Sequence, residues 1–239
     1  RGPVRGLLHG LPVGVKDLFD TADMPTTYGS TIYADHHPAA DAACVALCRE
    51  QGALMLGKTV TTEFATFTPG KTRNPHRLTQ TPGGSSSGSA AAVADFMVPL
   101  AFASQTAASV IRPAAFCGIV GYKPSFGLIN RAGVKALSDS LDNIGFLARS
   151  VEDVALFAAA ANGARTLPDL SSAGTPRIAM CPTHEWPHAD EDTRAAFARA
   201  GQALSSAGAL AAAPPLPPAF ASLLQTQKEI MAFDLARSL

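Results

Sequence analysis

The sequence contains few of the features that mark specialised protein classes. Among 239 residues it has one tryptophan, three tyrosines and four cysteines. Its 19 basic and 19 acidic side chains cancel and are scattered, which argues against a nucleic-acid stripe or a polybasic membrane patch. No apolar run reaches the length of a membrane span. The start, Arg1 to Arg5, has neither an initiator methionine nor a signal-peptide core, so we expect a fragment or processed chain from the cytoplasm.

The remaining composition is that of a folded globular protein. Hydrophobic residues make up 47% of the chain, and 239 residues are enough to bury a substantial core. Cys44 and Cys48 are four positions apart in an expected helix and therefore share one face. We interpret them as small core residues of a reducing compartment rather than as metal ligands.

Short apolar segments alternate with helical patterns along the chain, which favours an α/β fold. Asp41 is the expected N-cap of the first helix, and Ser150 with Asp153 forms a capping box before another. Strands are expected at 11–15, 53–56, 98–103 and 177–181. Helices are expected at 41–51, 61–67, 150–161, 192–207 and 220–239. The phenylalanines at 64, 67, 96 and 102 are expected in the core, the alternative being a substrate wall.

The segment Pro82–Ser89 is the most informative part of the sequence. Glycines and serines alternate there directly before an alanine-rich helical segment, 90–94. Such a loop brings backbone N–H groups and hydroxyls together without bulky side chains, which suits an anion or a developing oxyanion. The loop alone is ambiguous, and two further residues make it a more specific signal of a site: Lys16 after an apolar strand, and Ser109 within the segment 105–113.

A serine nucleophile needs a base, and histidine is the usual one. All six histidines stand in polar or proline-flanked stretches and are expected to be solvated loop residues: His9, His36, His37, His76, His184 and His188. Lys16 is the other available base, because burial among apolar neighbours would keep its amine neutral. The alternative for Lys16 is a surface residue paired with Asp17.

Several ordered motifs together resemble the amidase signature family. The segment 10–17 matches the family's lysine motif, and 83–89 matches its glycine/serine-rich signature. Thr106–Gly118 is similar to the nucleophile segment, followed by a Gly-x-Lys-Pro-Ser match at 121–125. Ser85 follows Lys16 by 69 positions and Ser109 follows Ser85 by 24, spacings typical of the family.

This resemblance implies a fold and a set of roles. The fold would be α/β, with a mixed central β-sheet flanked by helices on both faces, in a truncated version. One domain would cover 1–239, with a core signature region at 9–163 and a partial C-terminal region at 164–239. Lys16 would be the base, Ser85 a bridging serine after a cis peptide bond, and Ser109 the nucleophile. Backbone N–H groups of Thr106, Ala107, Ala108 and Ser109 would form the oxyanion hole.

The same resemblance implies an amidase that needs no metal or organic cofactor. The expected partner is a small-molecule amide substrate, with no nucleic acid and no membrane, and with a homodimer allowed. Family substrates range from fatty and aryl amides to precursors of glutaminyl-tRNA, and the neutral charge of this chain argues against the last of these. Ala108 departs from the pattern, which has glycine before the nucleophile. Arg112 would pair with a carboxylate, either to organise the site or as a salt bridge at the edge of the core.

Two other functions remain open from the residues. Residues 84–88 also fit a Gly-x-Ser-x-Gly nucleophile elbow with Ser86 as nucleophile, which would need an acid such as Asp142 or Asp153 together with His184. An elbow also requires a strand directly before it, and 74–82 is polar and loop-like. The second alternative is an amidase-like binding or interaction module with impaired catalysis.

Overall fold

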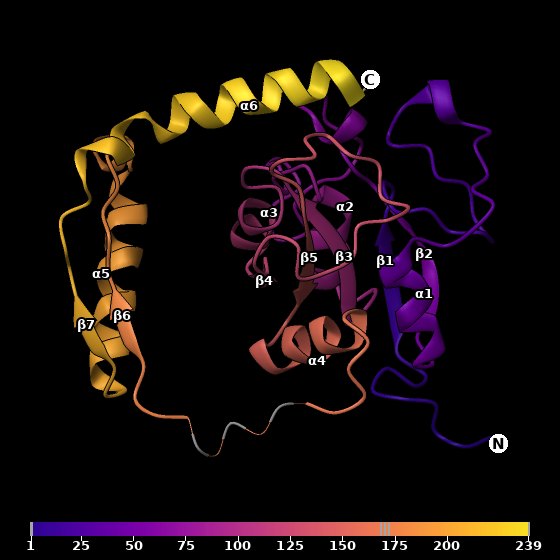
Figure 1. The fold of residues 1–239 in the computed structure, drawn as a ribbon, viewed down its shortest axis with the longest axis horizontal. Coiled ribbons are helices and arrows are strands. Elements are labelled where there is room, and N and C mark those ends of the chain that lie inside the picture. The colour runs from indigo at the N-terminus through magenta and orange to yellow at the C-terminus, as the bar shows by residue number, and fades with distance from the viewer. Residues whose placement is uncertain (1, 168, 170, 172, 239) are drawn as a thin grey trace. The chain divides into compact units, whose positions relative to one another are not determined.

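The computed structural model describes residues 2–167, 169, 171 and 173–238 (Figure 1). The chain divides into two compact units. The first contains Arg1–Leu167 together with Ile230–Leu239, and the second is Pro168–Glu229. The assignment of 1–239 to one domain stays a prediction, because two compact units can belong to a single domain.

A five-stranded mixed sheet organises the first unit, in the order β2-β1-β3-β5-β4 (Figure 1). Strands β2 (Leu54–Thr59), β1 (Pro12–Lys16) and β3 (Leu100–Gln105) run parallel to one another. Strand β5 (Asn143–Ala148) is antiparallel to β3, and β4 (Val120–Tyr122) is antiparallel to β5. The expected mixed α/β sheet is therefore confirmed.

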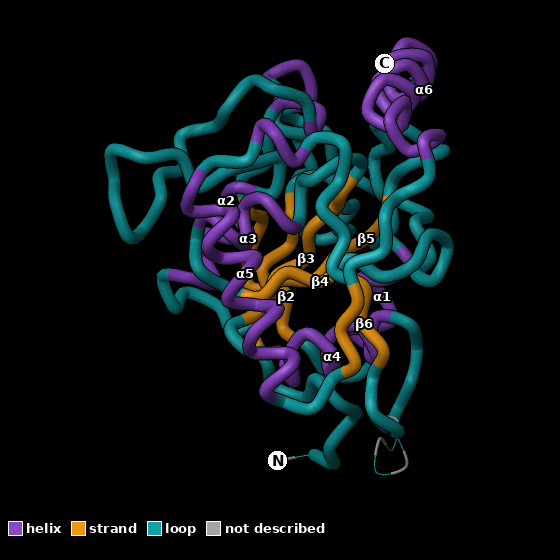
Figure 2. The backbone as a smooth tube through the Cα atoms, turned by 90° about the vertical axis from the view of Figure 1, so that its left-hand side faces the viewer, coloured by secondary structure: helices purple, strands orange, loops and turns teal. Residues whose placement is uncertain are grey.

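Helices cover both faces of this sheet (Figure 2). Helices α1 (Ala43–Glu50) and α4 (Val151–Ala161) pack against each other, and α4 also packs on β5. Helices α2 (Ser87–Ala94) and α3 (Ile111–Phe116) contact each other, with α2 on β1 and β3. Two separate hydrophobic clusters result, one between the sheet and each helix pair.

The alternation of side chains along β3 explains the two clusters. Phe102 lies in the first cluster, with its ring centroid 4.6 Å from that of Phe157, while Ala101 and Ala103 lie in the second. Because the second face carries small residues, the alanine-rich helix α2 can approach the strands closely. Cys44 and Cys48 are buried in the first cluster, as the sequence indicated.

Most expected elements of the first unit are present, with shifted ends. Ser150 accepts a hydrogen bond from Asp153 N at 3.1 Å, which confirms the cap of α4. The expected Asp41 cap is wrong: Ala42 occupies the N-cap of α1, and the Asp41 carboxylate pairs with Arg49 instead. The expected helix at 61–67 is a short 3₁₀ turn, Glu63–Ala65, and a second such turn spans Thr31–Tyr33.

Two of the four phenylalanines expected in the core are not there. Phe102 is fully buried and Phe64 packs partly against the first cluster. Phe67 and Phe96 are 83% and 76% exposed. Phe96 has a positive φ of 59° directly after α2, and the guanidinium of Arg149 lies 4.6 Å from its ring centroid. The turn that ends α2 therefore turns the ring outward.

The second unit is built around a small parallel ribbon. Strand β6 (Arg177–Ala179) pairs with β7 (Leu210–Ala212), and α5 (Glu191–Ser206) packs on β7. Asp190 caps α5 by accepting a hydrogen bond from Thr193 N at 2.7 Å. The sequence did not predict β7, because the alanines and prolines of 211–218 are typical of a linker or surface loop. Two 3₁₀ turns, Trp186–His188 and Pro218–Ser222, complete the elements before the last helix.

The last helix, α6 (Leu223–Ser238), begins in the second unit and returns to the first. Within the first unit, Asp234 Oδ2 accepts hydrogen bonds from Ser138 Oγ at 2.6 Å and from Ser140 N at 3.1 Å. The end of α6 thereby holds the loop that precedes β5. Among the described residues, no helix is both long and apolar enough to cross a bilayer.

Candidate active site

The carboxyl ends of β1, β2 and β3 meet at one edge of the sheet, the usual place for a site in an α/β fold. Lys16 is the last residue of β1, and its side chain is fully buried. Its strand neighbour in β2 is Thr59. The alternative of a surface lysine paired with Asp17 is therefore wrong. Asp17 faces Lys58 instead, with 3.4 Å between its carboxylate and that ammonium.

The Lys16 amine contacts two serines. Its Nζ lies 2.8 Å from Ser85 Oγ and 2.9 Å from Ser104 Oγ, with the Ser104 carbonyl at 3.4 Å. A neutral amine has one lone pair, so it can accept a proton from one hydroxyl while donating to the other. Sequence reasoning missed Ser104: its place directly after the expected strand 98–103 was a usable signal, but the position of that strand beside β1 was not.

Burial changes the acidity of Lys16. Desolvation lowers the pKa of the amine to about 7, because a buried ammonium loses its hydration, and the negative charge of Asp142 opposes this shift. A substantial neutral fraction is therefore present near pH 7. This is the protonation state that a lysine base requires.

The glycine/serine loop is held at three successive residues. The Gly84 carbonyl accepts hydrogen bonds from Arg112 Nε and Nη2, at 2.9 and 2.8 Å. The Ser85 carbonyl accepts one from Thr62 N at 3.1 Å, and Ser86 N donates to the Ser109 carbonyl at 3.3 Å. The Gly84–Ser85 peptide bond is cis, as the family resemblance predicts.

These contacts bring the predicted base, bridging serine and nucleophile into one region. Lys16 forms a hydrogen bond with Ser85, and the backbone N–H of Ser86 forms one with the backbone carbonyl of Ser109. Ser109 is buried, with 8% of its surface exposed. Its hydroxyl forms no hydrogen bond with the part of the chain that the structure describes. The arrangement leaves that hydroxyl available to a ligand.

The loop before α3 presents unpaired backbone donors. Within the described residues, the N–H groups of 106–109 donate to no protein acceptor. The next two amides, of Val110 and Ile111, both donate to Gln105 Oε1, at 2.9 and 3.1 Å. Gln105 therefore closes the start of α3 and leaves four consecutive amides free. Sequence reasoning assigned no role to Gln105.

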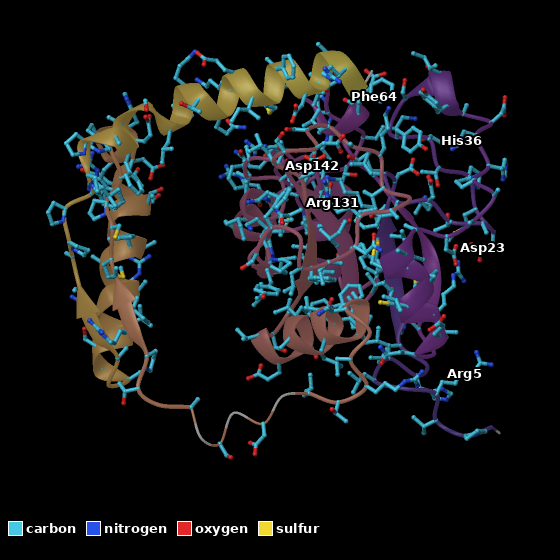
Figure 3. The ribbon with its side chains drawn as sticks, viewed as in Figure 1. Arg5, Asp23, His36, Phe64, Arg131 and Asp142 are labelled. Carbon is cyan, nitrogen blue, oxygen red and sulfur yellow. The ribbon has the colours of Figure 1, made fainter. Side chains whose placement is uncertain are left out.

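Asp142 lies at the same end of the sheet, among the side chains of the first unit (Figure 3). Its Oδ1 accepts a hydrogen bond from Thr106 Oγ1 at 2.5 Å. Its Oδ2 accepts from Leu137 N at 2.8 Å and Ser138 N at 3.1 Å. The carboxylate thus links the loop that carries the free amides to the loop before β5.

The nucleophile-elbow alternative finds no support in this geometry. Ser86 Oγ donates to the Ser104 carbonyl at 3.3 Å, and no strand lies between Val60 and Ser86. Asp142 bonds to Thr106 and to backbone amides rather than to an imidazole. His184 belongs to the second unit. The expected pairing of Arg112 with a carboxylate is also wrong, because its partner is the Gly84 carbonyl.

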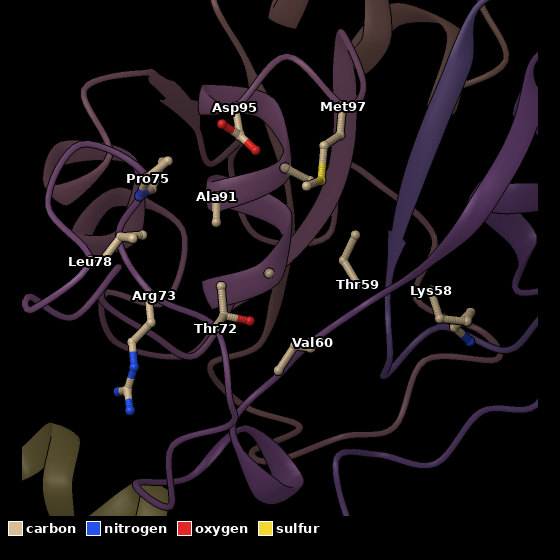
Figure 4. A pocket seen from close by; sticks show the side chains of 12 residues that line it. Lys58, Thr59, Val60, Thr72, Arg73, Pro75, Leu78, Ala91, Asp95 and Met97 are labelled. Atoms are coloured by element: carbon tan, nitrogen blue, oxygen red, sulfur yellow. The ribbon is translucent and has the colours of Figure 1, made fainter.

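A cavity of about 440 Å³ lies between β2, α2 and the loop 72–78 (Figure 4). Arg73 and Asp95 stand on different sides of it, and Val60, Leu78 and Met97 line it. Lys16, Ser85 and Ser109 are not among its lining residues. This cavity is therefore distinct from the cluster around Lys16.

Comparisons with known proteins show the family to which this chain is related. A family model described as Amidase matches residues 2–239. The A subunit of the glutamyl-tRNA(Gln) amidotransferase from Chlamydia pneumoniae is 44% identical over 164 residues, which cover 65% of this chain and 33% of that protein.

Two solved structures extend the comparison. The A subunit of the glutamyl-tRNA(Gln) amidotransferase from Thermotoga maritima matches with a TM-score of 0.85 and 33% identity, over 96% of this chain and 55% of that one. The native peptide amidase of Stenotrophomonas maltophilia matches with a TM-score of 0.81 and 29% identity, over 99% of this chain and 54% of that one. The chain thus spans about a third of the length of the curated relatives it matches and about half of these solved structures.

Proposed function

Because the chain belongs to the Amidase family, we propose that it cleaves a carboxamide C–N bond through an acyl-enzyme formed on Ser109. Lys16, in its neutral form, removes the proton of Ser85, and Ser85 takes the proton of Ser109. The second transfer requires the Ser109 hydroxyl, which has no hydrogen bond within the described residues, to turn toward Ser85 Oγ when substrate is bound. The Ser109 oxygen attacks the carbonyl carbon of the amide. The proton returns through Ser85 to the leaving nitrogen, the C–N bond breaks, and an ester to Ser109 remains.

Water completes the cycle through the same relay. A water molecule loses a proton to the relay and attacks the ester carbonyl, and Ser109 leaves with that proton restored. In both tetrahedral intermediates the carbonyl oxygen carries a negative charge. The free amides of 106–109 are the groups that would donate to it, which stabilises the transition state.

The observation that carries this proposal is the 2.8 Å contact between the buried Lys16 amine and Ser85 Oγ. A fully buried lysine without a carboxylate partner in direct contact is costly to keep protonated. Its hydroxyl contacts and its lowered pKa match the requirements of a proton acceptor. The free amides beside Ser109 supply the second requirement of acyl transfer.

The test measures hydrolysis of a panel of small primary amides and aryl amides by the amount of ammonia or amine that is released. We expect Ser109→Ala and Lys16→Ala to remove turnover. Ser125→Ala, at an exposed serine after β4, is the matched control and should keep the activity of the unchanged protein. Unchanged hydrolysis by purified Ser109→Ala would overturn the proposal. A folded chain that hydrolyses no amide would favour the binding-module alternative, to which the departure at Ala108 points.

A second candidate function follows from the names of the relatives. Several proteins that are 44–48% identical to this chain over about 160 residues are A subunits of glutamyl-tRNA(Gln) amidotransferases. The ammonia that leaves as the acyl-enzyme forms would then pass to an acceptor, water would hydrolyse the ester on Ser109, and other subunits would be partners. Adding glutamine as the amide donor distinguishes the two: glutaminase activity that depends on Ser109 favours the amidotransferase, and preference for other amides favours a free-standing hydrolase.

A further inference from the structure

A buried carboxylate outside the proposed relay is bonded to the loop that carries the free amides. Asp142 is 8% exposed, and each of its oxygens has a protein partner. Thr106 is the first residue of the amide run 106–109, and its hydroxyl donates to Asp142 at 2.5 Å. The other carboxylate oxygen is held by two amides of the loop before β5. Asp142 is therefore held in place independently of its contact with Thr106.

We propose that the Thr106–Asp142 hydrogen bond is a positioning contact that aims the free amides of 106–109 at the oxyanion of the proposed acyl transfer. This inference rests on the proposed function. Thr106 acts through its side chain on the direction of its own backbone and of the residues that follow. Neither side chain needs to touch the substrate.

The two ends of the amide run have different supports, which is why one side-chain bond matters. After the run, Gln105 Oε1 fixes the amides of Val110 and Ile111. At the start of the run, the pairing of Gln105 with Asn143 of β5 fixes the end of β3, and the Thr106 hydroxyl bond to Asp142 fixes the first residue of the run itself. Without the Thr106 bond, the first of the four amides loses the side-chain contact that sets its direction, and a preorganised oxyanion site is weakened.

The loop that carries Asp142 is anchored independently of the proposed site. Ser138 Oγ and Ser140 N both donate to Asp234 on α6. Asp139, on the same loop, is 83% exposed at its side chain and lies 3.7 Å from Arg131. Asp139 therefore offers a matched carboxylate that touches neither Thr106 nor the relay.

Asp142 also raises the pKa of Lys16 through its charge. A pH profile therefore separates this effect on Lys16 from the effect of Asp142 on the direction of the free amides. The groups that face the Lys16 amine from β3 and from the glycine/serine loop are the uncharged hydroxyls of Ser104 and Ser85. Among the described residues, Asp142 is the charged group that raises the Lys16 pKa against burial. Loss of the Thr106 hydroxyl leaves this charge in place, whereas loss of the carboxylate removes it.

The experiment measures the rate at which a fluorophosphonate labels Ser109, because the phosphonyl oxygen occupies the oxyanion position. We expect Thr106→Val to lower the labelling rate about tenfold to hundredfold, which is less than the roughly hundredfold to thousandfold cost of removing a donor outright, because the amides stay present and lose only their direction. Thr106→Ser keeps the hydroxyl and should restore a rate close to that of the unchanged protein. Asp139→Asn should have no effect. Thermal unfolding of each variant checks that the fold is kept.

The pH dependence of labelling gives a second readout. Thr106→Val should lower the plateau of the rate without moving the midpoint of its pH profile. Asp142→Asn should move the midpoint to lower pH, because the charge that raises the Lys16 pKa is gone. A labelling rate for folded Thr106→Val equal to that of the unchanged protein would overturn the positioning role while leaving the proposed function intact. Absence of Ser109 labelling in the unchanged protein would overturn both.

Discussion

At the scale of single residues, the proposed chemistry depends mainly on the protonation state of one lysine. Lys16 ends an apolar strand, and its burial lowers the pKa of its amine to about 7. A lysine at the surface would have a pKa near 10.5 and would be charged at neutral pH. The difference converts a cation into a base, and it follows from position in the fold rather than from the residue type.

The shift in Lys16 predicts a pH profile for the proposed reaction. The lowered pKa means that protonation occurs as the pH falls through about 7, so the neutral base is lost below that point. We expect kcat/KM for amide hydrolysis to fall about tenfold per pH unit below the midpoint and to level off above it. Lys16→Arg, which stays charged at all accessible pH values, should be inactive throughout.

The measurement is kcat/KM across the range from mildly acidic to alkaline pH on one amide substrate. The ionisation of the substrate must be constant over that range, which an aryl amide without titratable groups provides. A rate that keeps rising far into the alkaline range would mean that the base has the pKa of an ordinary lysine. Such a result would contradict the burial argument.

The sequence indicated which residues gather in this region, for a physical reason, while their catalytic roles stay predictions. Lys16, Ser85 and Ser109 stand in motifs whose residue types and order can be read directly. Ser104, Gln105 and Asp142 were missed as contributors because their contacts depend on which strand ends lie side by side. A hydrogen bond between Thr106 and Asp142 joins positions 36 apart, and nothing in either local pattern specifies it.

At the scale of elements, close contact between α2 and β2 positions the glycine/serine loop. Gly88 N donates to the Val60 carbonyl at 2.8 Å, and Ser87 Oγ donates to the same carbonyl at 3.2 Å. A Cβ on Gly88 would lie 2.3 Å from Val60 N. The start of α2 can therefore approach the end of β2 only because residue 88 has no side chain.

This contact predicts that Gly88→Ala destabilises the protein. Alanine is the better helix former by about 1 kcal/mol, but the clash is with backbone that cannot move aside cheaply. We expect a net loss in the free energy of unfolding of about 1–3 kcal/mol, typical of an overpacked contact. Chemical denaturation of the purified variants measures it.

Gly57→Ala is the matched control, because a Cβ there has no heavy atom within 4 Å. It lies inside β2, where replacing glycine costs nothing sterically, and it should be neutral or slightly stabilising. Equal stabilities of the two alanine variants would show that α2 does not depend on this contact.

Helices and strands were predicted where a local sequence pattern specifies them, and they were missed where contacts with neighbouring strands determine the structure. The cap of α4 needed only Ser150 and Asp153 in sequence, and it was confirmed. The strand β5 was not expected, although all six of its residues are buried. A short segment buried on both faces shows no alternation, and only its place between β3 and β4 makes it a strand.

At the scale of the whole molecule, the chain contains two compact units and a terminal helix whose residues belong to both. The return of α6 to the first unit, through Asp234, could not be read from the sequence, because its partners Ser138 and Ser140 lie 96 and 94 positions earlier. Membership of the family rests on the match over 2–239. The substrate and the acceptor of the nitrogen remain proposals, since the matched segment covers 33% of the Chlamydia pneumoniae relative.

The central claim is that Ser109 is the nucleophile of a site whose base is the buried Lys16. Mass-spectrometric mapping of a fluorophosphonate adduct on the folded chain tests it most directly. The account predicts one adduct, on the peptide that contains Ser109, formed at mildly alkaline pH and suppressed in Lys16→Arg. An adduct on Ser86 or on another serine, or a Ser109 adduct that forms equally fast without the lysine amine, would contradict it.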